Sequence, residues 1–291
     1  MSGARTIAAT LAAASAMAVA AAPLAAQSSA DERAALRGAL WLNKTPAATA
    51  GGQVADTVVA LRAAGATRAA VRPRLRVLAR SGPRYARTAG ASAKVVLAAV
   101  AGGVDPSRLG RHDYVRGVTS RYAAGRYGAT LFDQALSFLA LRAAGRPIPR
   151  TALRTTLRAR GGGGWSFDMS RAGRDMVDGT GLMIEALRAA GVPARHPHLR
   201  AATAWMLAQR NREGGFASAG RGGATQANPT SNVIRALRAM GRPAPASTRA
   251  ALRRLQTRSG AFRFTGPRAG SALMATTDAV PALAGRTLPV R

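Results

Sequence analysis

The chain has 291 residues and a formal net charge of +31; 47% of its residues are hydrophobic, but only 4% are aromatic. It contains no cysteine, which excludes a disulfide framework and a thiolate metal site. A hydrophobic core in this chain must be built from alanine, leucine and valine, and alanine is the strongest helix former.

The positive charge is spread along the whole chain, and every basic residue except Lys44 and Lys94 is an arginine. No basic stretch is interleaved with aromatic residues, as it would be in a protein that binds single-stranded nucleic acid. No motif that reads a nucleic-acid groove is present either. We therefore expect no specific nucleic-acid partner, and non-specific contact with anionic polymers such as cell-wall glycans.

Residues 1–26 have the pattern of a secretory signal peptide. Arg5 precedes the uncharged, alanine-rich run Ile7–Ala22, and small residues that suit a signal peptidase follow. A retained anchor is the alternative, since the run is nearly long enough to span a bilayer. Pro23 and the weak hydrophobicity of alanine favour cleavage, and no second apolar run follows. We expect an exported protein with no membrane span after cleavage.

A helix-ending motif recurs along the rest of the chain, residues 27–291, which we expect to form one domain. The motif, Leu-Arg-Ala-Ala-Gly in its clearest copies, ends at Gly65, Gly102, Gly145, Gly191, Gly241 and Gly285. Glycine is the usual residue just after a helix. Five intervals cover the 220 residues from Gly65 to Gly285, a mean of 44. A period of this length indicates stacked helical hairpins, because one hairpin cannot bury its own apolar face.

A glycine turn followed by an aromatic residue precedes the last helix of several copies. The clearest turns are Gly163-Gly164-Trp165, Gly214-Gly215-Phe216 and Gly260-Ala261-Phe262. In the best-defined unit, the spacing of apolar residues predicts a helix over about 197–211, then the turn, then a second helix from Asn228 to Gly241. Asn228 or Ser231 can cap that second helix. The whole pattern predicts six units, at about 31–65, 66–106, 107–149, 150–195, 197–241 and 247–288.

These residues resemble a known family. The stretch from Gln209 to Phe216, preceded by Trp205, resembles the glutamine-to-aromatic repeat of squalene and hopene cyclases, and Gln256 to Phe262 is a second copy. The same superfamily includes protein prenyltransferase β subunits and cobalamin carriers. The resemblance covers residues 31 to 289 and implies an all-α fold, an α/α toroid with an inner and an outer ring of helices. An open solenoid of the HEAT kind is the rival architecture.

The catalytic motifs of that superfamily are missing. The cyclases use an aspartate-rich run, and the nearest match, Asp175-Met-Val-Asp178, lacks the paired terminal aspartates. The zinc site of the prenyltransferases needs a cysteine. His196 and His198 make a pair without an evident third ligand. We therefore expect no metal and no cofactor, and no cyclisation of squalene.

A candidate site follows from the implied toroid, in which the glycine turns and the starts of the inner helices meet at one end. Convergent helix starts offer free amides and partial positive charge to a polar ligand. The residues expected to bind a ligand there are Trp165, Phe167, Asp178, Phe216, Asn228, Phe262 and Asp278. The alternative interpretation is structural: the polar residues cap helices, and the aromatic residues pack beneath the turns.

Three functions fit these patterns, and fold resemblance does not choose among them. The first is an exported module that binds a small molecule or a glycan at the end of the toroid. The second is an enzyme acting on an isoprenoid or a polysaccharide, with Asp175 and Asp178 as candidate catalytic acids. The third is a surface scaffold. A wide cavity with facing carboxylates would favour the enzyme, and a cavity filled by alanine and leucine would favour the scaffold.

The signal-peptide pattern gives the first testable prediction. Expressed from its full coding sequence in a host with a secretory pathway, the protein should be recovered outside the cytoplasm with an amino terminus near Ser28. Intact mass and amino-terminal sequencing measure this directly. Protein that stays in the cytoplasm with Met1 attached would contradict it.

Overall fold

The computed structural model describes residues 30–46, 51–218, 220–266, 268 and 270–290, which form helices joined by turns and loops. Within this described part, strands are absent apart from isolated β-bridges such as the one between Ser166 and Asp175. The predicted all-α class is confirmed. None of the described helices is long and apolar enough to cross a membrane. The predicted signal peptide over 1–26 lies outside the described residues.

The helices follow the predicted units in pairs. The first helix covers residues 30–44 and pairs with α2 (Gly51–Ala63). The next are α3 (Arg68–Tyr85), α4 (Ala89–Ala101), the short 3-10 turn η1 (Leu109–Arg111), α5 (Tyr114–Thr119), α6 (Leu131–Ala143), α7 (Arg150–Arg158), α8 (Val177–Ala189), α9 (Pro197–Ala208), α10 (Ala227–Ala239), α11 (Ala246–Arg254) and α12 (Ala272–Leu283). The hairpin predicted over 197–241 is therefore the pair α9 and α10.

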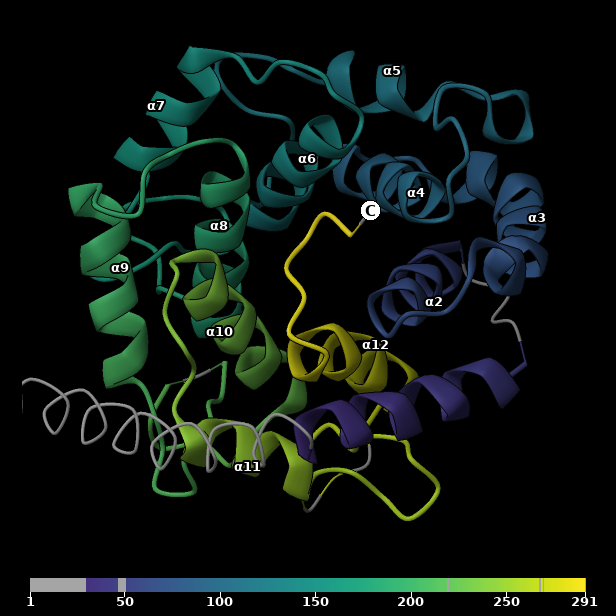
Figure 1. Cartoon of the computed structure of the whole chain (residues 1–291). Helices are drawn as coiled ribbons and strands as arrows, with labels where there is room; N and C mark the ends of the chain where they lie inside the picture. Colours follow the sequence, from purple (N-terminus) through teal and green to yellow (C-terminus); the bar gives the residue numbers. More distant parts are fainter. Residues whose placement is uncertain (1–29, 47–50, 219, 267, 269, 291) are drawn as a thin grey trace, which may run out of the picture.

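The second helices of these pairs, α2, α4, α6, α8, α10 and α12, are called the central helices below. Each packs against the next along the chain, and α12 packs against α2, so the series of contacts returns to its start. The first helices of the pairs lie on the outside of this series (Figure 1).

The last unit also contacts the first through polar groups. The Asp31 carboxylate of the first helix accepts hydrogen bonds from Arg249 and Arg253 on α11, with Arg249 Nε at 2.8 Å. Just after α11, the Gln256 side-chain amide donates to the Ala34 carbonyl at 2.8 Å. Units at opposite ends of the described chain are therefore joined in both the central and the peripheral helices.

The motif glycines end the central helices as the sequence predicts. Five of the six have the positive φ that favours glycine: Gly65, Gly145, Gly191, Gly241 and Gly285. The second copy needs one correction, because Gly102 keeps a right-handed helical conformation and Gly103 takes the left-handed one.

A repeated hydrogen bond fixes the turns before the central helices. The backbone N–H groups of Trp165, Phe216 and Phe262 donate to the hydroxyls of Thr180, Thr230 and Thr276, at 3.0, 3.1 and 2.8 Å. In α6 the Gln134 amide oxygen accepts from the N–H of Tyr127 at 2.8 Å. Each bond gives a buried N–H its hydrogen-bond partner and fixes the position of a turn relative to the central helix that follows it.

Glycine is required in these turns for two physical reasons. A Cβ at Gly163 would collide with the Trp205 ring of the neighbouring α9. Gly214 and Gly260, at equivalent places in the next two turns, have φ of +88° and +99°, where other residues are strained.

The caps predicted at the start of α10 are wrong. The residue before the helix is Gln226, which makes no side-chain capping bond. Asn228 instead directs its amide to Asp278 of α12 at 2.5 Å, and the Ser231 hydroxyl is buried without a hydrogen-bond partner. Asp278 is not at a helix start either, since α12 begins at Ala272. These residues are therefore free of the capping role that sequence position suggests.

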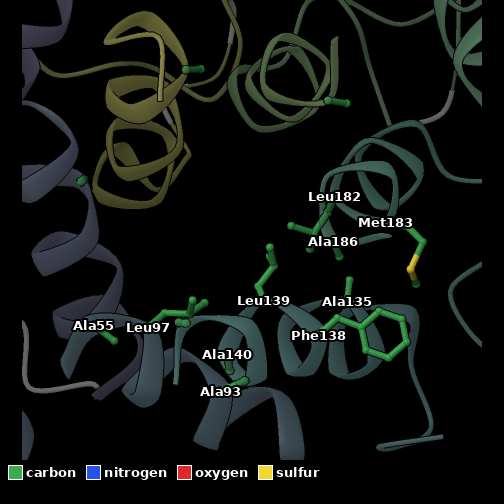
Figure 2. Packing of buried hydrophobic residues seen from close by; sticks show 14 of the residues in the cluster. Ala55, Ala93, Leu97, Ala135, Phe138, Leu139, Ala140, Leu182, Met183 and Ala186 are labelled. Carbon is green, nitrogen blue, oxygen red and sulfur yellow. The ribbon is translucent and has the colours of Figure 1, made fainter. Parts of the chain in front are cut away.

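The core lies along and behind the central helices and is rich in alanine, as the composition requires. Leu97 of α4, Leu139 of α6 and Leu182 of α8 point toward the same central space, whereas Phe138 and Met183 lie on the other sides of their helices (Figure 2). Small residues at the helix contacts let α4, α6 and α8 approach closely, which places the leucines around a common centre.

The turn hydrogen bonds generate a stability prediction. Thr230→Val removes the hydroxyl that accepts from Phe216 N, and the buried N–H loses its partner at nearly constant side-chain volume. The free energy of unfolding should fall by about 1–3 kcal/mol. Thr119→Val, at an exposed position of α5, is the control and should change it by less than about 0.5 kcal/mol. Urea unfolding of both variants measures the difference, and equal effects would contradict the assigned role.

Candidate functional site

A cavity of about 350 Å³ lies between the central helices. Its volume is at the lower end of the range for small-molecule sites. Its walls are formed by Asp56, Val59, Lys94, Leu97, Phe132, Leu136, Asp178, Leu182, Ser218, Asn228, Asn232, Arg235, Phe264, Met274, Thr277, Asp278, Pro281 and Leu288. We call this space the central cavity.

The threonines that hold the turns, Thr180, Thr230 and Thr276, explain why these side chains face the cavity. Two residues before each threonine stand Asp178, Asn228 and Met274, respectively. Two residues after each threonine stand Leu182, Asn232 and Asp278. All of them line the cavity. Residues four apart lie on the same face of a helix, and the threonine midway between them lies on the opposite side, facing the turn. The next helical turn adds Arg235 of α10 and Pro281 of α12.

One wall of the cavity is apolar. Phe132 and Leu136 come from α6, Leu182 from α8, and Leu97 and Val59 from α4 and α2. No polar side chain from α6 faces the cavity. This wall can bury the hydrocarbon part of a ligand, which contributes about 25 cal/mol per Å² of apolar surface removed from water.

The polar wall of the cavity, which shares helices α2, α4 and α8 with the apolar one, holds two ion pairs. Lys94 Nζ lies 2.7 Å from a carboxylate oxygen of Asp56, and both side chains are partly exposed to the cavity. Arg235 Nε lies 3.1 Å from a carboxylate oxygen of Glu185, and this pair is almost completely buried. Burial by itself would lower the pKa of Arg235, but the combined attraction of Glu185 and Asp278 outweighs it and raises the pKa. Both cations on this wall are thus already matched by a carboxylate.

Two further carboxylates on this wall, Asp178 and Asp278, form no salt bridge with any cation of the described residues. Asp178 accepts a hydrogen bond from the Gly179 N–H at 3.0 Å and a longer one from the Ser218 hydroxyl at 3.4 Å. Asp278 accepts from the Asn228 amide. Burial raises the pKa of both carboxyls, and the Arg235 guanidinium offsets part of the rise for Asp278. Raised carboxyl pKa values in a cavity are typical of functional sites.

The cavity opens beside the starts of the central helices. Met274, in the first turn of α12, lines the cavity and is 50% exposed. Phe167, in the loop before α8, is 54% exposed, and its ring lies 6.2 Å from the ring of Phe132 in the cavity wall. Exposed apolar side chains at this opening can receive an apolar ligand. We call it the mouth.

The structure brings some of the predicted ligand-binding residues together. Asp178, Asn228 and Asp278 all line the central cavity, and Phe167 lies at its mouth through contact with Phe132. They come from three units, since Phe167 and Asp178 share the fourth, so their proximity depends on the packing of the central helices.

The other predicted aromatic residues do not line the cavity. Trp165, Phe216 and Phe262 are fully buried, each with 0% exposure, and the Trp165 indole N–H donates to the Thr156 carbonyl at 2.8 Å. They pack beneath the turns, as the structural alternative holds. A side chain with no exposed surface cannot contact a ligand without local unfolding, so we leave these three out of the site.

Asp175, one of the two candidate catalytic acids, also lies away from the cavity lining. One of its carboxylate oxygens accepts from the N–H groups of Gly163 and Gly164 at 2.8 and 2.9 Å. Asp175 therefore holds the glycine turn, and only Asp178 of the candidate pair faces the cavity.

Sequence reasoning missed Lys94, Glu185, Asn232 and Arg235 as members or neighbours of this site. A signal was present, because charged residues inside otherwise apolar helices are rare unless they are paired. Glu185 is such a residue in α8, and Arg235 is its counterpart in α10. The pairing itself joins residues 50 positions apart, which sequence spacing does not reveal.

The described residues contain no group of three or more potential metal ligands. His196 and His198 lie near each other at the start of α9, with ring centroids 5.5 Å apart, and His196 Nδ1 accepts from the His198 N–H. His196 thus caps α9.

No known family model matches this chain, and no curated protein sequence matches it.

The raised pKa of Asp178 predicts how stability depends on pH. The folded protein binds this proton more tightly than the unfolded chain does, so the resulting stabilisation is present below the ordinary aspartate pKa of about 3.9 and is lost as pH rises through the higher folded pKa. Asp178→Asn keeps the acceptor oxygen but cannot ionise. The stability of this variant relative to the parent should therefore increase with pH, as measured by urea unfolding between about pH 4 and 7.

Asp168→Asn is the control with the opposite sign. Hydrogen bonds from the Ser170 N–H and the Ser166 hydroxyl lower the pKa of the exposed Asp168 carboxyl. Its stabilisation is present above the ordinary aspartate pKa and is lost as pH falls. The stability of this variant relative to the parent should decrease as pH rises. The same sign for both variants would contradict the assignment.

Proposed function

We propose that this chain is an exported binding protein with the α/α toroid architecture of the squalene cyclase and prenyltransferase superfamily. The closed series of contacts from α2 to α12 supports a toroid over an open solenoid, because α12 and α2 would be far apart in a solenoid. The turns that carry the resemblance are also those in which a threonine of the central helix holds the aromatic N–H. Export rests on the signal-peptide pattern of residues 1–26.

The proposed ligand is a small amphipathic molecule with a cationic or hydrogen-bond-donating polar end. Its apolar part would lie against the wall formed by Phe132, Leu136 and Leu182. Its polar end would meet Asp178 and Asp278, the two lining carboxylates that form no salt bridge among the described residues. This charge balance is the observation that carries the proposal: a positively charged protein has an excess of carboxylates inside its cavity.

The scaffold alternative is less well supported. A toroid that only presents its surface gains nothing from desolvated carboxylates, since burying a charge costs stability unless it is paired. Alanine and leucine could fill the same positions at no such cost. Retaining Asp178 and Asp278 in the cavity is more readily explained by a role in binding.

An enzyme remains the second candidate, because carboxyls with raised pKa values can act as proton donors near neutral pH. Asp178 and Asp278 would take this role in place of Asp175, whose carboxylate holds the glycine turn. The apolar wall suits an isoprenoid better than a polysaccharide. Incubation with short linear isoprenoid alcohols, followed by mass analysis, tests this: a product that Asp178→Asn fails to form would establish catalysis.

The binding proposal predicts a charge-dependent loss of affinity. n-Octylamine should bind the parent protein, measured by calorimetry at about pH 8, where the amine is cationic. Asp178→Asn and Asp278→Asn should each weaken binding by roughly tenfold or more, because a hydrogen bond to a charged group contributes about 1.5–3 kcal/mol. The melting temperature should not fall in Asp178→Asn, which keeps the acceptor oxygen.

Two controls separate recognition of charge from general effects. 1-Octanol has the same hydrocarbon chain without the positive charge, so its affinity should change little in the same variants. Asp105→Asn removes an exposed carboxylate outside the cavity and should leave octylamine binding as in the parent. If Asp178→Asn and Asp278→Asn both bind octylamine like the parent, the proposed site is incorrect and the scaffold alternative takes its place.

A further inference from the structure

The chain returns into the centre of the molecule after its last helix. α12 ends at Leu283, and Gly285, with φ of +63°, turns the backbone. The following segment runs across the middle of the central helices (Figure 1). We call residues 286–290 the C-terminal segment.

Specific contacts hold the C-terminal segment in place. The Leu288 N–H donates to a carboxylate oxygen of Glu185 at 2.8 Å. Val290 is buried and packs with Ala63 and Ala101, which end α2 and α4. The Arg286 N–H donates to the Pro281 carbonyl at 2.9 Å. The segment is thus attached to α2, α4, α8 and α12, at the ends of these helices opposite the mouth or midway along them.

The contact with Leu288 supplies a hydrogen-bond partner for the carboxylate oxygen of Glu185 that does not pair with Arg235. One carboxylate oxygen of Glu185 pairs with Arg235, and the other accepts the Leu288 N–H. Glu185 is almost completely buried, and a buried carboxylate needs hydrogen bonds to both oxygens. If the C-terminal segment left its place, the second oxygen would lose its partner. The need of the buried Glu185 carboxylate for this hydrogen bond therefore favours the observed position of the segment.

The side chain of Leu288 lines the central cavity together with Val59, Leu97 and Pro281. These residues belong to later turns of their helices than Phe132 and Met274, which lie near the mouth. Leu288 is thus placed at the deep end of the cavity, where the C-terminal segment crosses it.

We propose that the C-terminal segment closes the deep end of the central cavity and that Leu288 sets how far a ligand entering at the mouth can reach. The closure stands on the contacts of the segment alone, whereas the role of Leu288 in ligand length rests on the proposed binding function. The two parts are tested separately.

The closure is tested with single introduced cysteines. The chain has no natural cysteine, so each introduced thiol reports the accessibility of one position. Leu97→Cys places a thiol in the deep part of the cavity, and Met274→Cys places one at the mouth. Each is combined with truncation after Gly285 or, without shortening the chain, with Val290→Asp, which puts a charge into the packing against Ala63 and Ala101. The rate of modification by iodoacetamide is measured for every combination.

Removing or displacing the segment should speed modification of Leu97→Cys by about tenfold or more, because local opening exposes that position. Met274→Cys should change by less than about twofold, because it is already exposed at the mouth. Circular dichroism checks that each protein is folded, and Val290→Asp carries the test if the truncated chain is not. An unchanged rate at Leu97→Cys in a folded protein would overturn the closure.

The role of Leu288 is tested with n-alkylamines from butylamine to dodecylamine. Affinity should rise by about fourfold per methylene up to a limiting length, beyond which the chain meets Leu288. Leu288→Ala should move this limit to longer amines, and the control Leu36→Ala, at an exposed position of the first helix, should not. An unchanged limit in Leu288→Ala overturns the role of Leu288. If the cysteine test succeeds but no amine binds the parent, the closure stands and the proposed binding function fails.

Discussion

The hydrogen bond from a turn N–H to a threonine of the next helix is the interaction on which the site depends. It recurs at Trp165, Phe216 and Phe262, and each of these aromatic side chains is fully buried beneath its turn. The bond fixes the rotation of the central helix about its own axis, because the threonine must face the turn. The residues two positions before and after it then face the centre, and four of these six positions carry polar side chains of the cavity: Asp178, Asn228, Asn232 and Asp278.

The distribution of charge follows from the same arrangement. The arginines that give the chain its net charge of +31 lie mainly at its surface, where water and salt screen them. The inward positions instead hold two ion pairs and the two carboxylates of Asp178 and Asp278. The positively charged surface and the cavity carboxylates that form no salt bridge are thus separate features. The prediction of non-specific contact with anionic polymers concerns the surface alone.

Glu185 and Arg235 connect the helices, the cavity and the C-terminal segment. Their ion pair bridges α8 and α10, Arg235 also donates to the Asn232 amide oxygen and to the Asp278 carbonyl, and Glu185 accepts from Leu288. Removing one partner from a buried pair is costly, about 3–5 kcal/mol, because it leaves an uncompensated charge. The polar wall and the deep end of the cavity are therefore coupled through one buried network.

Local sequence determined the helices and their ends. The glycines after each central helix and the glycine-aromatic turns are short-range signals, since φ and helix termination depend on neighbouring residues, and the predicted units correspond to the observed helix pairs. The expected convergence of helix starts also pointed to Asp178, Asn228 and Asp278, although Asp278 lies in the second turn of α12 and not at its start. Tertiary structure alone decided which side chains meet: it buried Trp165, Phe216 and Phe262, paired Glu185 with Arg235 across two helices, and brought Leu288 into the cavity. Such contacts depend on the rotation and packing of whole helices, which no local pattern encodes.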